Sequence, residues 1–255
     1  MLAVFLISMV SMAAVLLFLF APAWFPVPIS PEAVLYDSQF HLNLVVLGAL
    51  FIVAQLLLAA SLLRKRRASH PRGSMMLETG WAVLITLLFA FLGVTGARGW
   101  TGSRMEAARP AESIEVYAQQ FAWHFRYPGA DQKFGRTDIA MINDAAMNPL
   151  GLVPGDPAGK DDVVTALLRV PVGRPVVLTL HSRDVIHDFF VRELRLKQDI
   201  VPGMDIPYRF QADRTGRFEI ACAELCGLGH SQMHGLMEVM TESDYQAWKR
   251  AQIRP

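Results

Sequence analysis

The first quarter of this sequence lacks basic residues, and the whole sequence has few cysteines and no repeats. No Lys or Arg precedes Arg64, so the positively charged start of a typical secretory signal peptide is missing. Only two of the 255 residues are cysteines, and the stretch Cys-x-x-Cys-His does not occur, which excludes a covalently attached haem c. We also find no internal repeat and no low-complexity segment.

Apolar residues are abundant and unevenly distributed. They make up 53% of the chain, and the mean hydropathy of +0.30 is high for a globular protein. Nearly all of the excess lies before Arg98, in runs at residues 2–20, 44–63 and 81–97. A membrane span needs about 20 apolar residues. The second run meets this length, and the third does so if its helix begins near Met75 and carries Glu78 close to the membrane face. We therefore expect a transmembrane helix hairpin over residues 42–98.

Residues 1–22 form either an N-terminal hydrophobic helix or a cleaved signal segment. The missing basic residues favour an uncleaved extra helix.

The charged loops predict the orientation of the hairpin. Four consecutive basic residues at 64–67, followed by Arg72, fill the short loop between the second and third runs, which indicates a cytoplasmic loop. The loop around Glu32 and Asp37 carries no Lys or Arg and is expected outside. Residues 99–255 then lie outside as well. We expect a multi-pass membrane protein. In a bacterial cell this would be the inner membrane, with the C-terminal domain in the periplasm, where disulfides can form.

The pattern after residue 98 indicates one all-β domain. Residues 113–127 alternate in part, as expected of a strand or hairpin with one buried face, and residues 144–160 are a turn-rich loop. Residues 243–252 predict a terminal helix capped by Ser243 or Thr241. Further short strand-like runs suggest a β-sandwich or barrel; they cover residues 166–170, 175–181, 185–194, 206–211, 217–222 and 234–240.

Residues 222–233 concentrate soft metal ligands. Both cysteines, Cys222 and Cys226, lie here with His230 and Met233. A mixture of thiolate, imidazole and thioether donors favours copper used for electron transfer. A mononuclear blue-copper site needs one cysteine, whereas two cysteines four residues apart could bridge a pair of ions.

Ligand chemistry alone does not identify the second histidine ligand, because His181, His187 and His234 are all candidates. Two other interpretations of the cysteines also exist. Paired periplasmic cysteines often form a disulfide, and Cys and His also bind zinc. The downstream His230 and Met233 argue against the disulfide, and a Met ligand at this spacing is unusual for zinc.

Four segments resemble subunit II of the haem–copper cytochrome c oxidases. They are Glu-Thr-Gly-Trp at 78–81, Ser-Arg-Asp-Val-Ile-His at 182–187, Leu-Lys-Gln-Asp-Ile-Val-Pro-Gly at 196–203, and the ligand segment at 222–233. The resemblance covers roughly residues 42–245. It implies a membrane-anchored, two-helix hairpin that carries a cupredoxin-like β-sandwich, with a dinuclear copper centre, CuA, in the sandwich.

The resemblance also implies the copper ligands. These are two bridging thiolates, one imidazole for each copper and two weak donors: Cys222 and Cys226, His187 and His230, and Met233 with the backbone carbonyl of Glu224. The side chain of Glu224 is implied to reach a magnesium or manganese ion shared with subunit I. His181 and His234 are then expected at the surface or beside the ligands, and Met237 and Met240 in packing or at the surface.

Two further positions follow from the family. Its usual Trp-Tyr-Trp segment is Phe121-Ala122-Trp123 here, which makes Phe121 and Trp123 the electron-relay candidates and departs from the usual route. Glu78 matches a Glu at the mouth of a proton channel of subunit I. Without the resemblance, it would be a carboxylate that reaches the membrane interface.

The implied function is electron transfer within an oxidase. Cytochrome c would reduce the copper pair, and haem in subunit I would receive the electron for oxygen reduction to water coupled to proton pumping. Acidic and basic residues nearly balance after residue 98, which favours a weakly basic or permanently bound donor. We expect no nucleic-acid partner. The alternatives are the copper subunit of a nitric oxide reductase, a copper-free quinol oxidase subunit II and a periplasmic copper chaperone; the complete ligand set argues against the second, and the Glu78 hairpin against the third.

Overall fold

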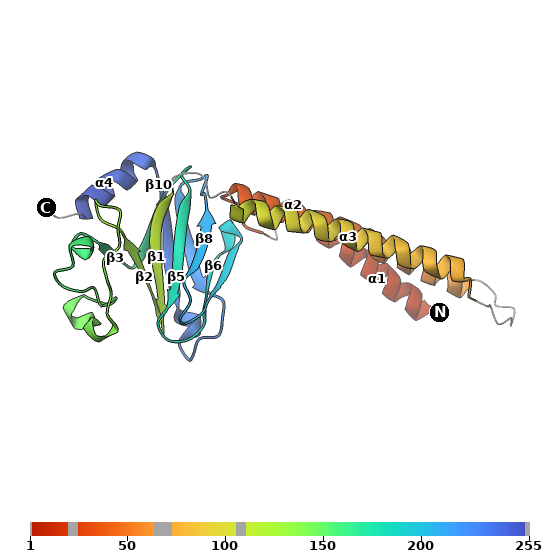
Figure 1. Cartoon of the computed structure of the whole chain (residues 1–255). Coiled ribbons are helices and arrows are strands. Elements are labelled where there is room, and N and C mark those ends of the chain that lie inside the picture. Colours follow the sequence, from red (N-terminus) through yellow and green to blue (C-terminus); the bar gives the residue numbers. More distant parts are fainter. Residues whose placement is uncertain (1, 20–24, 64–72, 106–110, 253–255) are drawn as a thin grey trace. The chain divides into compact units, whose positions relative to one another are not determined.

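A computed structural model describes residues 2–19, 25–63, 73–105 and 111–252 (Figure 1). Its contacts divide the chain into two units. The helical unit comprises Met1–Pro26 and Leu35–Gly102, and the β unit comprises Val27–Val34 and Ser103–Pro255.

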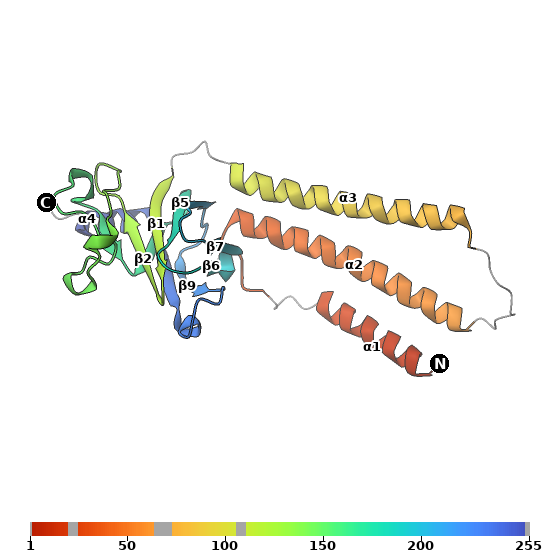
Figure 2. The same ribbon diagram turned by 60° about the horizontal axis from the view of Figure 1, so that its bottom comes forward.

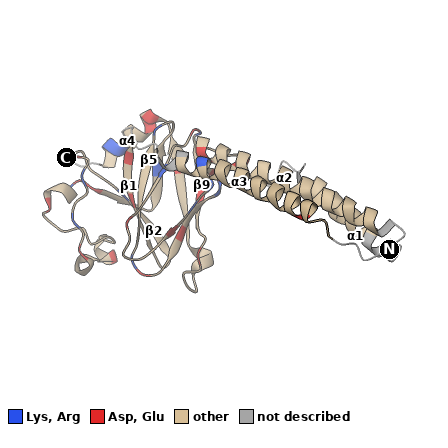
Figure 3. Cartoon of the chain, turned by 45° about the vertical axis from the view of Figure 1, so that its right-hand side comes forward, with Lys and Arg blue, Asp and Glu red and all other residues tan. Residues whose placement is uncertain are grey.

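Three helices account for the apolar runs: α1 (Leu2–Leu19), α2 (Pro31–Leu63) and α3 (Met75–Met105). Among the residues that the structure describes, two stretches are long and apolar enough to span a membrane, Pro31–Ser61 and Met75–Thr101, and α1 contributes the shorter apolar stretch Phe5–Phe18. In Figure 3, where Lys and Arg are blue and Asp and Glu are red, the ribbons of these helices are almost entirely tan. The third helix begins at Met75, as predicted.

Helix α2 begins at Pro31, well before the expected start of the hairpin at residue 42. Proline is favoured at the first helical position, and Ser30 caps the helix by accepting a hydrogen bond from the Ala33 amide at 3.1 Å. The polar residues Glu32 and Asp37 hid this start in the sequence, because they do not belong to an apolar run.

Polar side chains connect the helices within their unit. Ser8 Oγ of α1 donates to Gln55 Oε1 of α2 at 2.9 Å, and Gln39 Nε2 of α2 reaches the Leu92 carbonyl of α3 at 3.5 Å. Helices α2 and α3 run side by side in Figures 1 and 2. The basic loop at 64–72, on which the predicted orientation depends, lies outside the described residues.

The β unit is a sandwich of two five-stranded sheets, which confirms the predicted fold class. The first sheet has the order β3 (Val163–Thr165), β2 (Ala122–Tyr127), β1 (Glu112–Gln119), β5 (Val176–Ser182), β8 (Ile206–Phe210). The second has the order β4 (Leu167–Pro171), β10 (His234–Met240), β9 (Gly216–Cys222), β6 (His187–Val191), β7 (Leu196–Ile200). The pairs β1–β5 and β4–β10 are parallel, and the other pairs are antiparallel.

The core lies between the sheets and follows the period-2 alternation of strands. In β1, Ile114, Val116 and Ala118 are buried. In β10, Met237 is buried and Met240 packs against the core, so of the two predicted alternatives, packing or surface, both residues take the first.

Most predicted strands are present, with shifted bounds. The run at 185–194 is shorter than expected because Val185 and Ile186 are exposed and β6 begins only at His187. Strands β3 and β7 were not predicted as strands. The terminal helix α4 (Glu242–Gln252) is capped by Thr241, whose Oγ1 accepts from the Asp244 amide at 3.3 Å.

A short N-terminal segment completes the β unit. Ile29 is only 3% exposed; its amide donates to the Glu193 carbonyl at 3.1 Å, and its carbonyl accepts from the Asp213 amide at 2.8 Å. The unit is therefore not the continuous segment 99–255 that the sequence suggests. Ile29 is the one buried apolar residue between Pro28 and the start of α2, and a lone apolar residue has no periodicity by which it could be recognised.

Candidate metal centre

Strand pairing brings the two ligand segments together. Strand β6 pairs with β9 so that Phe189 lies opposite Cys222, and His187, two residues before Phe189, shares its face of the strand. The loop that follows β9 is closed at its base, because the Cys222 amide donates to the Met233 carbonyl at 3.2 Å. His187 and the loop 223–233 thus meet at the same end of the sheet.

The atoms of all the predicted copper ligands gather around the two sulfurs. Cys222 Sγ and Cys226 Sγ are 3.8 Å apart. Around them, Nδ1 of His187 is 3.9 Å from Cys222 Sγ, Nδ1 of His230 is 3.7 Å from Cys226 Sγ, Sδ of Met233 is 3.8 Å from Cys226 Sγ, and the Glu224 carbonyl oxygen is 3.2 Å from Cys222 Sγ.

This arrangement fits metal ions better than a disulfide. Both cysteines are free, and 3.8 Å is far longer than the S–S bond of about 2.05 Å. With a metal–sulfur distance of about 2.3 Å, one ion can touch both sulfurs at this separation. The ligand atoms of His187, Cys222 and Cys226 lie within 4.8 Å of one another. Soft thiolates, imidazoles and a thioether make copper the fitting metal.

The centre is largely withdrawn from water. His187 and Met233 are fully buried, and both cysteines are buried. Burial raises the pKa of the Cys226 thiol to about 11, and the hydrogen bond and charge of Cys222 add to this shift. Metal binding at neutral pH therefore has to displace a proton from this thiol.

Asp184 orients the ring of His187. Asp184 Oδ1 lies 2.8 Å from His187 Nε2, and a carboxylate can only accept, so Nε2 carries the proton and Nδ1 faces Cys222. Burial acts to raise the pKa of Asp184, but hydrogen bonds from the Gln120 amide and His187 outweigh it and lower that pKa. The carboxylate thus stays charged beside the ligand.

The two aromatic candidates occupy different positions. Trp123 is 2% exposed in the core, where its ring meets His187 edge-on with centroids 6.3 Å apart. Phe121, in the turn between β1 and β2, is 38% exposed, and its ring lies against the backbone of Gly227 and Gly229 in the ligand loop. Phe121 is the surface residue of the pair and Trp123 the buried one.

His181 and His234 lie outside the ligand cluster, as predicted. His181 stacks on Tyr117 and its Nδ1 is 2.9 Å from Asp205 Oδ1. His234 is half exposed and bonded to the Ser231 carbonyl and Glu219.

Sequence reasoning missed two residues of the centre. Asp184 is part of the segment 182–187 but was not given a role, although its position three residues before His187 was a usable signal. Gln120 carried no signal, because its contacts with Asp184 and Cys226 bridge 64 and 106 positions of the chain.

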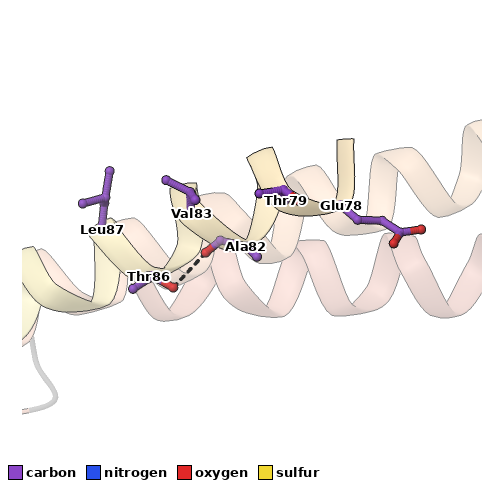
Figure 4. A pocket seen from close by; sticks show the side chains of 6 residues that line it. All are labelled: Glu78, Thr79, Ala82, Val83, Thr86 and Leu87. Carbon is purple, nitrogen blue, oxygen red and sulfur yellow. Dashed lines mark hydrogen bonds between the residues drawn. The ribbon is translucent and has the colours of Figure 1, made fainter. Parts of the chain in front are cut away.

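Glu78 lies in the helical unit, in the first turn of α3 and at the end of a candidate membrane span. It lines a shallow hollow on α3 with Thr79, Ala82, Val83, Thr86 and Leu87 (Figure 4). Of these six residues, Glu78 alone is ionisable. An acidic group is favourable at this end of the helix dipole.

The chain is similar to known proteins over both units. The family model "Cytochrome C oxidase subunit II, periplasmic domain" matches residues 113–240. The "Alternative cytochrome c oxidase subunit 2" of Bradyrhizobium diazoefficiens is 35% identical over 254 residues, which cover 97% of this chain and 90% of the relative. The "Cytochrome c oxidase subunit 2" of Thermostichus vulcanus is 30% identical over 259 residues, covering 88% and 77%. Among solved structures, the periplasmic domain of subunit II of the cytochrome oxidase of Bradyrhizobium japonicum matches with a TM-score of 0.41 and 24% identity, over 56% of this chain and 95% of that chain.

Proposed function

This chain belongs to the family of cytochrome c oxidase subunit II, and we propose that it accepts electrons from cytochrome c at a pair of copper ions and passes them to haem in subunit I. Reduction of oxygen to water and the coupled proton pumping would occur in that partner subunit. The chain itself would be an electron-carrying component of an oxidoreductase.

The observation that supports this proposal most strongly is the convergence of the ligand atoms on two free sulfurs. Cys222 and Cys226 would bridge the coppers as thiolates, and His187 and His230 would bind one copper each. Met233 and the Glu224 carbonyl would be the weak donors. Bound there, the copper pair would take up and release one electron at a time.

The protein contributes rigidity and exclusion of water. His187 and Cys222 lie on paired strands, and the loop 223–233 is held by turns, among them the His230 amide to the Gly227 carbonyl at 3.1 Å. A centre whose ligands stay in place changes little between redox states, and the buried surroundings tune its potential.

Electrons would arrive on the side of Phe121, the exposed aromatic ring that touches the ligand loop. Trp123, edge-on to His187, is the buried relay candidate. The side chain of Glu224 is exposed while its carbonyl faces Cys222, which suits the proposed magnesium or manganese site shared with subunit I. Glu78 would lie at the mouth of a proton channel of subunit I.

The protein is anchored in a membrane and carries a periplasmic domain. We assign that membrane to the bacterial inner membrane. The clustered ligands argue against a copper-free quinol oxidase subunit. The choice between oxygen and nitric oxide as final acceptor depends on subunit I, and gas consumption by the purified complex would decide it.

The test uses the complex that contains the full chain. We expect two coppers per chain and an EPR spectrum of one unpaired electron shared by two coppers. His230→Ala should abolish this spectrum, whereas His234→Ala, four residues further on, should leave it intact. One copper, zinc, or an intact spectrum in His230→Ala would overturn the assignment.

A further inference from the structure

We infer that the β1–β2 turn, Gln120–Phe121, is a clamp that positions the metal-ligand loop, with Phe121 as a plate against Gly229. Glycine at position 229 is then required by the ring of Phe121 and not by its own backbone. The copper measurements below rest on the proposed function, whereas the thiol measurement does not.

The ring of Phe121 lies so close to the backbone of Gly227 and Gly229 that a side chain at either position would crowd it. A Cβ atom added to Gly229 would be 2.5 Å from Phe121 Cδ2 and 2.7 Å from both Cε2 and Cγ, and one added to Gly227 would be 3.1 Å from Cζ. Real Cβ contacts are essentially never shorter than 3.0 Å. Leu228, between these glycines, is fully exposed. The ring is thus seated on the backbone that joins Cys226 to His230.

The two glycines differ in their backbone conformation. Gly227 has φ +142°, which side chains of L-residues rarely adopt. Gly229 has φ −91° and ψ 10°, which other residues also adopt. For Gly229 the three atoms nearest to an added Cβ all belong to the Phe121 ring, so the contact with Phe121, and not the backbone conformation, explains why residue 229 has no side chain.

Gln120 connects the same turn to both halves of the centre. Its side-chain Nε2 donates to the Cys226 carbonyl at 2.5 Å, and its backbone amide donates to Asp184 Oδ2 at 2.7 Å. The other oxygen of Asp184 accepts from His187. One turn of the first sheet therefore holds a cysteine ligand directly and a histidine ligand through one carboxylate. Gln120 and Phe121 are positioning residues, because they act through the ligands and do not bind the metal.

A double-mutant cycle in the full chain within its complex tests whether the Phe121 ring is what requires glycine at position 229. Gly229→Ala should speed the loss of copper to a chelator by about tenfold or more and distort the EPR spectrum, because the clash pushes the ligand loop away from the Phe121 ring that supports it behind the metal ligands. Phe121→Ala removes the obstacle, so Gly229→Ala in that background should have no further effect. Phe121→Trp, which keeps a flat ring, should retain copper like the original chain.

Gly227→Ala is the matched control. Its backbone is unfavourable for alanine whatever residue 121 is, so Phe121→Ala should not rescue it. The inference is overturned if Gly229→Ala behaves like the original chain, or if its defect persists in the Phe121→Ala background.

A second readout needs no copper. In the metal-free complex, Gly229→Ala should raise the rate at which a thiol reagent modifies Cys226, because the displaced loop covers this sulfur less, and the double variant should react like Phe121→Ala alone. If the original chain holds no copper pair, the proposed function fails. The thiol rates still confirm or overturn the clamp.

Discussion

The ligands were accessible to sequence reasoning because most of them are neighbours along the chain. Four of the five side chains lie within residues 222–233, and only His187 had to be chosen from three histidines. The resemblance made that choice, and the structure places His187 beside Cys222. The roles of Asp184 and Gln120 were not predicted from the sequence, because they depend on contacts that the fold creates. A motif reports which atoms bind the metal, whereas folding determines what holds those atoms.

Asp184 offers a prediction at the scale of one residue. Asp184→Asn keeps the shape of the side chain but removes the charge that holds the His187 ring. We expect copper to be retained about 10- to 100-fold less tightly, the usual effect of removing a partner behind a metal ligand. Competition with a chelator measures this.

Asp205→Asn is the matched control, because Asp205 is bonded to His181 and not to a predicted ligand. Equal copper loss in both variants, or none in either, would show that Asp184 does not orient His187.

At the scale of elements, the alternation of apolar and polar residues identified the strands that bury one face and expose the other. Strand β1 alternates throughout and was predicted. Strand β3 has only three residues, and β7 carries the polar Gln198 at its centre, so neither has an apolar pattern that could be recognised. Helix α2 extended beyond its apolar run because Ser30 and Pro31 start a helix locally, irrespective of hydrophobicity.

Helix α1 is expected to remain in the mature protein as a third apolar helix. The Gln55 amide lies within a candidate membrane span, where polar groups need partners, and Ser8 of α1 supplies one. Mass spectrometry of the purified complex should detect peptides from residues 2–19. A Ser8→Cys/Gln55→Cys variant should cross-link on mild oxidation.

The matched control for this cross-link is Ser8→Cys with Ser61→Cys, because Ser61 bonds within its own helix. A mature chain that begins after residue 22, or equal cross-linking in both variants, would contradict the retained helix.

At the scale of the whole molecule, the β unit depends on a residue from before the first candidate span. Ile29→Ala should lower the free energy of unfolding of the β unit by about 2–4 kcal/mol, because it leaves a cavity in the core. The nearby Val27 is 61% exposed, so Val27→Ala should change it by no more than about 0.5 kcal/mol. Thermal unfolding of the full chain, followed by near-UV circular dichroism, compares the two variants.

The same dependence applies to fragments. A fragment of residues 99–255 should unfold at a lower temperature than one in which residues 25–34 are fused back to it. If both fragments unfold together, Ile29 contributes nothing to the β unit.

The position of Ile29 also restricts how often the chain can cross a bilayer. Residue 29 pairs with the backbone at residues 193 and 213, so all three must lie on the same side. A path that leaves one side and returns to it crosses an even number of times, and the candidate spans in α2 and α3 would provide two crossings. This parity holds without reference to any charged loop. Helix α1 precedes residue 29, so it can change the side on which the chain begins but not the side on which the β unit folds.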